Sequence, residues 1–214
     1  MSKNFFEIKD VTFAIGGKNK VNDVNISIKN EGDTICILGP SGIGKTTMLR
    51  TIAGLEKINK GEIILKDKVI SSNKIHIEPE KRNIALSFQE NSLFPHYSVD
   101  KNIHLGVKKN PPTNKNIESR EIIKILNIDD ILSKYPHQIS AGEAQRASLA
   151  RSLISQPDLL LLDEPLSNVD QSFKEGIQVA LKQILNKNKI TTIVVTHDSY
   201  EAFYLGKKCA LILN

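Results

Sequence analysis

The sequence lacks tryptophan, has only two cysteines and five arginines, and contains no long hydrophobic run. Cys36 and Cys209 lie far apart in the chain of 214 residues, so they predict neither a disulfide framework nor a zinc site. No apolar run approaches the roughly 20 residues that a membrane-spanning helix needs. The first ten residues carry four charges and no apolar core, unlike a secretory signal. These absences favour a reducing compartment and a chain without a membrane span.

The charge balance says little about partners. Lys and Arg number 29 against 24 Asp and Glu, which gives a net charge of +5. Isoleucine (29), lysine (24) and asparagine (18) dominate, and AT-rich codons specify all three, so part of the positive charge reflects coding bias. Because the lysines are scattered and no tryptophan interleaves them, we expect no nucleic-acid partner. The hydrophobic share of 40% is typical of a globular protein.

Apolar runs alternate with helical patterns along most of the chain. Apolar runs without polar interruptions predict strands buried on both faces, as in a parallel sheet; they lie at 34–38, 83–88, 157–162 and 191–196. An apolar stripe predicts a helix over 171–186 that packs on this sheet. By contrast, 5–15 and 21–28 alternate apolar and polar residues, as half-exposed antiparallel strands do, and 60–70 resembles a hairpin.

The middle of the chain breaks this alternation. Between residues 90 and 155 the sequence favours helices, at 118–126, 129–135 and 142–154, with a linker-like stretch that begins at Asn110. We therefore predict a single α/β domain over 1–214. Its core comprises 1–89 and 156–214 and includes an N-terminal antiparallel β subdomain, and 90–155 forms an inserted α-helical subdomain.

A phosphate-binding loop lies between the strand at 34–38 and the helical pattern that follows. Residues 39–46 read Gly-Pro-Ser-Gly-Ile-Gly-Lys-Thr and fit the pattern G-x-x-x-x-G-K-[ST], which makes the core that of a P-loop NTPase with a mostly parallel sheet. Backbone N–H groups of the glycines point at phosphate, Lys45 supplies charge to the β- and γ-phosphates, and Thr46 offers an oxygen to Mg²⁺. The residues expected to bind ATP here are Gly39, Pro40, Ser41, Gly42, Ile43, Gly44, Lys45, Thr46 and Thr47.

Two acidic residues end the buried strand predicted at 157–162. In a parallel sheet, the carboxyl end of this strand lies at the same edge as the phosphate loop. Asp163 is therefore predicted to hold Mg²⁺ through its water shell, and Glu164 to polarise the attacking water. The alternative is that the two acids merely begin a turn before Pro165.

Further segments, in order from Phe5 to about Leu213, resemble the nucleotide-binding subunits of ABC transporters. Gln89 resembles the Q-loop glutamine, residues 140–146 the signature segment, 167–170 the D-loop and His197 the switch histidine. Phe13 is placed like the aromatic residue that stacks on adenine. The resemblance implies ATP and Mg²⁺ as cofactors and a homodimer that forms on ATP binding.

The resemblance assigns roles residue by residue. It implies a catalytic set of Glu164, His197, Gln89 and Lys45, and metal ligands Thr46, Gln89 and Asp163. The ATP on the opposite subunit would be contacted by Ser140, Ala141, Gly142, Glu143 and Asp170.

Several of these residues also have a purely structural interpretation. Ser140 is a good N-cap for the following helix, Phe13 equally suits the core, and a lone histidine is usually structural. Residues 139–143 read Ile-Ser-Ala-Gly-Glu and depart from the usual signature Leu-Ser-Gly-Gly-Gln at three positions, of which Ala141 and Glu143 bear on the site. Ala141 would strain the backbone if the position needs a positive φ. Glu143 would repel a phosphate unless it points away or pairs with Arg146.

Residues 93–96, Leu-Phe-Pro-His, resemble the importers for polyamines, ferric iron, thiamine, molybdate and sulfate. The resemblance implies a groove that receives a helix of an integral-membrane permease, with exposed Leu93, Phe94 and Tyr97 as anchors; the alternative is a loop with buried apolar residues. It further implies an extracytoplasmic solute-binding protein, and a peripheral position on the cytoplasmic face of the inner (cell) membrane. The competing hypotheses are a soluble ABC-type ATPase that acts on nucleic acid or ribosomes, and a non-hydrolysing ATP-binding regulator.

Overall fold

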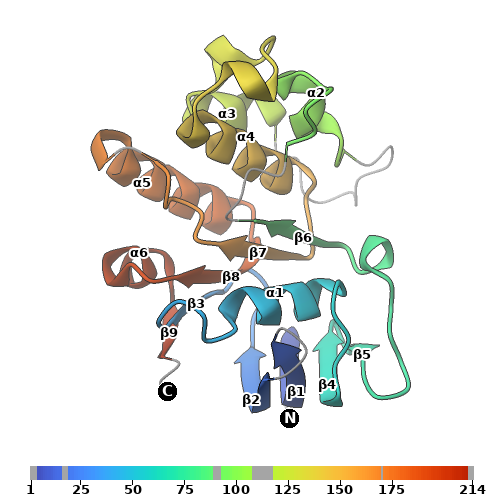
Figure 1. The fold of residues 1–214 in the computed structure, drawn as a ribbon. Helices are drawn as coiled ribbons and strands as arrows, with labels where there is room; N and C mark the ends of the chain where they lie inside the picture. The colour runs from blue at the N-terminus through green and yellow to red at the C-terminus, as the bar shows by residue number, and fades with distance from the viewer. Residues whose placement is uncertain (1–3, 16–18, 89–92, 108–117, 170, 212–214) are drawn as a thin grey trace.

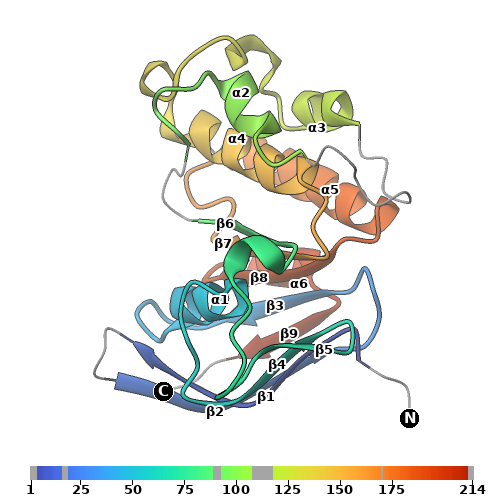
Figure 2. The ribbon, with the colours of Figure 1, turned by 90° about the vertical axis from the view of Figure 1, so that its right-hand side faces the viewer.

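Two β-sheets, with one helix between them and a helical layer above, form the structure (Figures 1 and 2). The computed structural model describes residues 4–15, 19–88, 93–107, 118–169 and 171–211. The strands are β1 (Phe6–Ile15), β2 (Asn19–Ile28), β3 (Thr34–Leu38), β4 (Lys60–Leu65), β5 (Lys68–Ser71), β6 (Ile84–Ser87), β7 (Leu159–Asp163), β8 (Thr191–Thr196) and β9 (Lys208–Leu211). The helices are α1 (Lys45–Ala53), α2 (Val99–His104), α3 (Ser119–Ile125), α4 (Ala141–Ile154), α5 (Gln171–Lys187) and α6 (Ser199–Leu205), with 3₁₀ turns η1 (Pro79–Lys81), η2 (Asp129–Ile131) and η3 (Pro136–Gln138).

The larger sheet is parallel, with strand order β6-β7-β8-β3-β9, and all of its strands except β9 correspond to the predicted apolar runs. Strand β7 shows why they do not alternate. Leu160 and Leu162 face a cluster formed with α4, α5 and α6, whereas Leu159 and Leu161 face α1 and the other sheet. Both faces are therefore apolar. The smaller sheet, with order β2-β1-β4-β5, is antiparallel, so the predicted fold class is confirmed.

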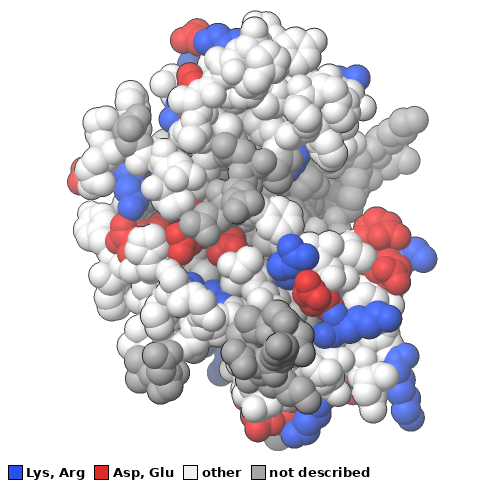
Figure 3. Space-filling view, in the orientation of Figure 1, with Lys and Arg blue, Asp and Glu red and all other residues white. Residues whose placement is uncertain are grey.

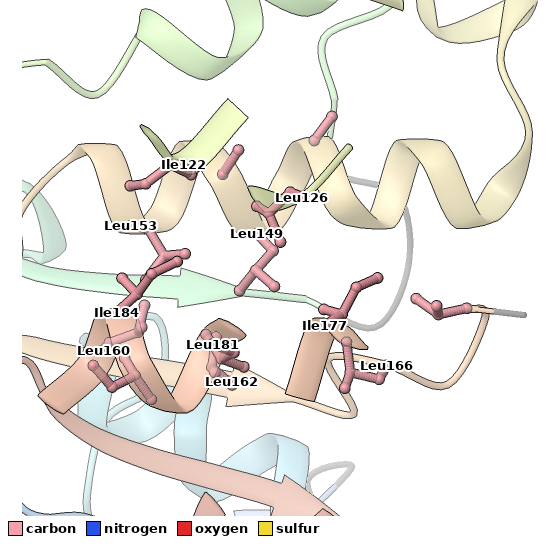
Figure 4. Close-up of a cluster of buried hydrophobic side chains, with 14 of the residues drawn as sticks. Ile122, Leu126, Leu149, Leu153, Leu160, Leu162, Leu166, Ile177, Leu181 and Ile184 are labelled. Carbon is pink, nitrogen blue, oxygen red and sulfur yellow. The ribbon is translucent and has the colours of Figure 1, made fainter. Parts of the chain in front are cut away.

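The helical segment shares one core with the parallel sheet. Leu149 and Leu153 of α4 point toward α5 and β7, and residues of α3 pack against α4 (Figure 4). In the described parts of 90–155 every regular element is a helix or 3₁₀ turn, which agrees with the helices of the predicted fold class. No helix within the described residues has both the length and the apolar character needed to cross a membrane.

The helix predicted over 129–135 is wrong: only the short turn η2 forms there. The carbonyl oxygens of Leu132 and Lys134 accept the backbone N–H groups of Asp100 and Val99, at 2.9 and 2.8 Å, so they serve the start of α2 instead of a helix of their own. Neither α2 nor α6 was predicted from the sequence. Strand β9 pairs with β3 at the sheet edge.

The two cysteines are neighbours across that edge pairing. Cys36 of β3 is the register partner of Cys209 of β9, and both thiols are free. Cys36 is completely buried, and this burial raises the pKa of its thiol to about 12. A thiol so hard to ionise is a poor nucleophile, so Cys36 serves packing.

Candidate active site

The phosphate loop turns the N-terminus of α1 toward a hollow at the carboxyl edge of the parallel sheet. Gly42 and Gly44 adopt left-handed conformations, with φ of 83° and 101°, and Gly44 is the N-cap of α1. Only glycine adopts these angles without strain. The residues that line the hollow come from the loop and from the end of β7: Ser41, Gly42, Gly44, Lys45, Thr46, Thr47, Asp163 and Glu164. The predicted phosphate loop and acid pair therefore meet in one place.

Lys45 is buried against the loop itself. Its Nζ donates to the carbonyl oxygens of Gly39 and Pro40, at 2.7 and 2.9 Å. No acidic residue lies in the first turn of α1, so nothing there offsets the partial positive charge of the helix end. The ammonium group and the helix end together favour an anion in the hollow.

Asp163 and Thr46 bring two hard oxygen donors together. Burial raises the pKa of Asp163, while a hydrogen bond with the Thr46 side chain and the nearby Lys45 charge act to lower it. Such donors suit Mg²⁺. Among the described residues no group of three or more His, Cys, Asp or Glu side chains could hold a metal. The third predicted ligand, Gln89, lies outside the described residues.

Glu164 and His197 come from adjacent strand ends and touch. Oε1 of Glu164 lies 3.1 Å from Nδ1 of His197, whose ring is exposed whereas the carboxylate is nearly buried. The backbone of Glu164 is left-handed, with φ of 46°, and its N–H donates to the carbonyl oxygen of Val195 at 2.8 Å. The structure thus places two predicted catalytic residues within hydrogen-bond distance.

The segment around His197 is braced by residues that the sequence interpretation missed. Lys174 of α5 contacts Asp198 at 2.6 Å and lowers its pKa, and Asp198 caps α6. On the other side, Thr196 Oγ1 donates to Glu201 at 2.7 Å and accepts the N–H of Asp198 at 3.0 Å. Glu201 is buried, which raises the pKa of its carboxyl. The spacing Asp-x-x-Glu after the histidine signals a helix start, but not these contacts across elements.

The signature segment begins α4 with a capping box. The Ser140 hydroxyl accepts the N–H of Glu143 at 3.2 Å, and Glu143 Oε2 accepts the N–H of Ser140 at 2.7 Å. The Ser140 N–H lowers the pKa of Glu143, so this carboxylate is tied to its own helix. Ala141 is the first helical residue and is not among the residues with positive φ, so the anticipated strain at this position does not occur.

Gly142 lies against the turn that follows Glu164. A Cβ atom at Gly142 would lie 2.8 Å from the backbone oxygen of Asn168, so the close approach requires glycine. Residues 140–143 are not among the described residues that line the phosphate hollow, and Asp170 lies outside the described residues.

The adenine contact of Phe13 stays a prediction. The ring is 2% exposed and belongs to the apolar core between the two sheets. Alternation along β1 turns Phe13 to the inner face with Val11. The core role, which the sequence left open, agrees with this burial. Phe13 still borders a hollow that Ile43 and Gly44 also line.

The expected anchors after the Q-loop differ in exposure. Leu93 is 7% exposed and belongs to the core, so its expected exposure is wrong, whereas Phe94 is 48% exposed. The buried Asn102 fixes this loop, because its Oδ1 accepts the Phe94 N–H at 2.8 Å and its Nδ2 donates to the Phe94 carbonyl oxygen at 3.0 Å. Phe94 lines a groove; the other residues that line it are Ile84, Ala85, Leu86, Phe88, Leu105, Gly106, Arg151, Ser152 and Ser155.

A parallel sheet that feeds a phosphate loop and a helix, with an acid pair at the end of a neighbouring strand, defines the class of P-loop nucleotide-binding proteins. Within that class, the chain belongs to the ABC transporter family, whose family model matches residues 21–167.

Curated relatives and solved structures agree with this membership. The chain is 37% identical over 214 residues to the Fe(3+) ions import ATP-binding protein FbpC of Fusobacterium nucleatum subsp. nucleatum. The matched segment comprises 99% of this chain and 56% of that protein. It is 36% identical over 213 residues to the spermidine/putrescine import ATP-binding protein PotA of Haemophilus influenzae, again 99% of the chain and 56% of the relative. The chain therefore spans little more than half the length of these relatives.

Among solved structures, the chain resembles a dimeric post-hydrolysis state of the ATP-binding cassette MJ0796 bound to ADP and Pi. The TM-score is 0.81 at 29% identity, over 97% of this chain and 94% of that one.

Proposed function

We propose that the chain is the ATP-binding and ATP-hydrolysing subunit of an importer-type ABC transporter, which couples hydrolysis in a dimer to solute uptake through a separate permease. The observation that carries this proposal is the hollow in which the phosphate loop, Lys45, Asp163 and Glu164 meet. The relatives are named import ATP-binding proteins for different solutes, so the proposal covers import and no particular solute.

Each residue of the hollow has a distinct role in this proposal. The loop N–H groups and Lys45 bind the phosphates, and Lys45 exchanges its loop carbonyl partners for phosphate oxygens. Thr46 and Asp163 hold Mg²⁺, which neutralises charge on the phosphates when bound. Glu164 accepts a hydrogen bond from the attacking water and polarises it, and His197 orients the Glu164 carboxylate.

The signature segment would complete the site of a second copy. Ser140 and the start of α4 are absent from the described lining of the hollow, and a helix N-terminus favours an anion. The similar ATP-binding cassette MJ0796 forms a dimer in its solved structure, which supports a dimer here. In such a dimer Gly142 keeps the start of α4 close to Asn168 and so leaves the segment free to face the partner.

A permease helix would occupy the groove beside Phe94. Its lining combines apolar side chains with Arg151, and a half-exposed aromatic ring suits an anchor for a partner helix. The subunit would then be peripheral, at the cytoplasmic face of the cell membrane, with an extracytoplasmic solute-binding protein as a further component.

The decisive experiment is Glu164→Gln in the purified chain. The change keeps the size of the side chain but weakens the base, so kcat for ATP should fall about 10²–10⁴-fold while ATP binding is kept. Glu62→Gln, on an exposed position of β4, is the matched control and should leave kcat unchanged. With ATP, the Glu164→Gln protein should also dimerise on sizing. Unchanged ATPase activity in Glu164→Gln would refute the assigned role.

The competing hypotheses make different predictions. A nucleic-acid ATPase requires a basic surface, but acidic and basic side chains are mixed on the face seen in Figure 3. Salt-sensitive binding of DNA or RNA would favour that hypothesis. Absence of hydrolysis, both by the dimer alone and with its permease, would favour a non-hydrolysing regulator.

A further inference from the structure

Gln145 is a buried side chain of α4 whose amide group bonds on both sides to the backbone around Glu164. It is 3% exposed. Its Nε2 donates to the carbonyl oxygen of Glu164 at 2.9 Å and to Ser167 Oγ at 3.3 Å, and its Oε1 accepts the N–H of Asn168 at 2.9 Å. One side chain thus links α4 to both ends of the turn that follows the acid pair.

The backbone at Glu164 needs such support. A non-glycine residue in the left-handed region is strained, and this conformation persists only where the surroundings fix it. Here the fixing contacts lie on both sides of the residue: Val195 accepts the Glu164 N–H, and Gln145 donates to the Glu164 carbonyl oxygen. These contacts aim the carboxylate toward His197 and the phosphate hollow.

The contact pattern demands an amide. Gln145 must donate to one backbone oxygen and accept from one backbone N–H, and among side chains of this length only glutamine does both at neutral pH. An ionised glutamate only accepts hydrogen bonds, and methionine donates none and accepts only weakly. If the Gln145 amide is replaced by a group that cannot donate, the Glu164 carbonyl oxygen loses one hydrogen bond that holds the strained backbone.

We propose that Gln145 is a positioning residue for the Glu164 carboxylate and that it ties the geometry of this base to helix α4. This inference rests on the proposed function of Glu164. As a consequence, helix α4 would couple the ATP site of the partner to the ATP site of its own subunit. The Ser140 end of α4 meets the phosphate of the partner, and Gln145, in the second turn of the same helix, fixes the base of its own subunit.

The test compares Gln145→Met and Gln145→Glu with Gln178→Met in steady-state ATPase assays of the purified chain with Mg-ATP. Gln178 of α5 is the matched control, since it is 2% exposed and its Nε2 has no hydrogen-bond partner among the described residues. For Gln145→Met we expect kcat to fall about 10- to 100-fold with KM and ATP affinity nearly unchanged, because a misplaced catalytic group costs rate and not binding. Gln178→Met should retain the wild-type kcat.

The pH profile separates positioning from general loss of packing. Burial raises the pKa of the carboxyl introduced by Gln145→Glu, and its protonated form donates and accepts as the amide does. The ratio of Gln145→Glu to wild-type kcat should therefore rise as the pH falls, whereas the ratio for Gln145→Met should stay flat. A flat ratio for both variants, or a Gln145→Met kcat equal to that of Gln178→Met, would overturn the inference.

The Glu164→Gln protein, assayed in parallel, keeps the two proposals apart. If Glu164→Gln loses activity and Gln145→Met does not, only the role of Gln145 fails. If Glu164→Gln stays active, the proposed function of Glu164 fails first.

Discussion

Replacement of Arg82 by methionine should destabilise the protein substantially, because this buried guanidinium holds the C-terminal end of α1. Nη1 donates to the carbonyl oxygens of Thr51 and Ile52 at 3.3 and 2.9 Å, and Nε donates to that of Ile77 at 2.6 Å. Nη2 donates to the Ser71 hydroxyl at 2.8 Å. Arg82 thereby joins the helix of the phosphate loop to the segment between β5 and β6.

The magnitude follows from two opposing effects. Methionine fills similar space but donates nothing, so Ile52, Ile77 and Ser71 lose a donor, whereas the Thr51 carbonyl oxygen still accepts the Gly54 N–H. Each buried acceptor left without its donor costs about 1–3 kcal/mol. Removal of a buried charge offsets part of this cost, since burial lowers the pKa of Arg82 to about 10. The net loss in free energy of unfolding should be about 2–3 kcal/mol.

Urea denaturation followed by circular dichroism measures this loss directly. Arg50→Met is the matched control, because Arg50 also lies on α1 but forms an exposed ion pair with Glu56 at 3.3 Å. Such pairs contribute little, so Arg50→Met should change the free energy of unfolding by less than about 1 kcal/mol. If both variants lose the same small amount, the hydrogen bonds of Arg82 do not stabilise α1 as argued.

Three further predictions use the same unfolding measurement. Gly142→Ala should destabilise the protein by about 1–3 kcal/mol, since its Cβ would lie 2.8 Å from a backbone oxygen. Gly176→Ala, in open space on α5, should instead stabilise the protein by about 0.5–1 kcal/mol. Changes of the same sign in the free energy of unfolding would contradict this prediction. Glu143→Ala should lower the free energy of unfolding by about 1 kcal/mol because the capping box is lost, whereas Glu143→Gln should lower it much less. Equal losses for the two variants would show that the capping box does not stabilise α4. Lys174→Met should cost about 1 kcal/mol at neutral pH and little in strong acid. The sign follows because Lys174 lowers the pKa of Asp198. The stabilisation by the ion pair is therefore present above the ordinary aspartate pKa and is lost as the pH falls through the lowered value. A destabilisation by Lys174→Met that does not change with pH would refute the stabilising role of this ion pair.

The parts that the sequence predicted depend on neighbours in the chain. The phosphate loop is a run of consecutive residues whose glycines and lysine act through local backbone geometry. Four strands of the parallel sheet were recognisable as apolar runs, because a strand buried on both faces does not alternate between apolar and polar residues, as β7 shows. The acid pair was found because it ends such a strand.

The parts that the sequence missed depend on contacts between distant segments. Gln145 lies nineteen positions before Glu164, and Lys174 lies twenty-four before Asp198, so no local pattern joins either pair. Phe13 shows what the sequence alone leaves open. Its place near the start of the chain matched an adenine contact, but only the packed sheets decide which face of β1 is covered.

The register of three strands places the candidate catalytic groups, and the apolar core fixes that register. Leu38 pairs with Thr196 and Asp163 pairs with Val195, so β3, β8 and β7 end within one residue of each other. The phosphate loop, His197 and Glu164 therefore start from one edge. A slip of one residue would move a strand end by about 3.3 Å and turn each side chain to the opposite face. That slip would separate Glu164 from His197 and also exchange the two buried faces of β7, so the packing that stabilises the sheet protects the site from misalignment.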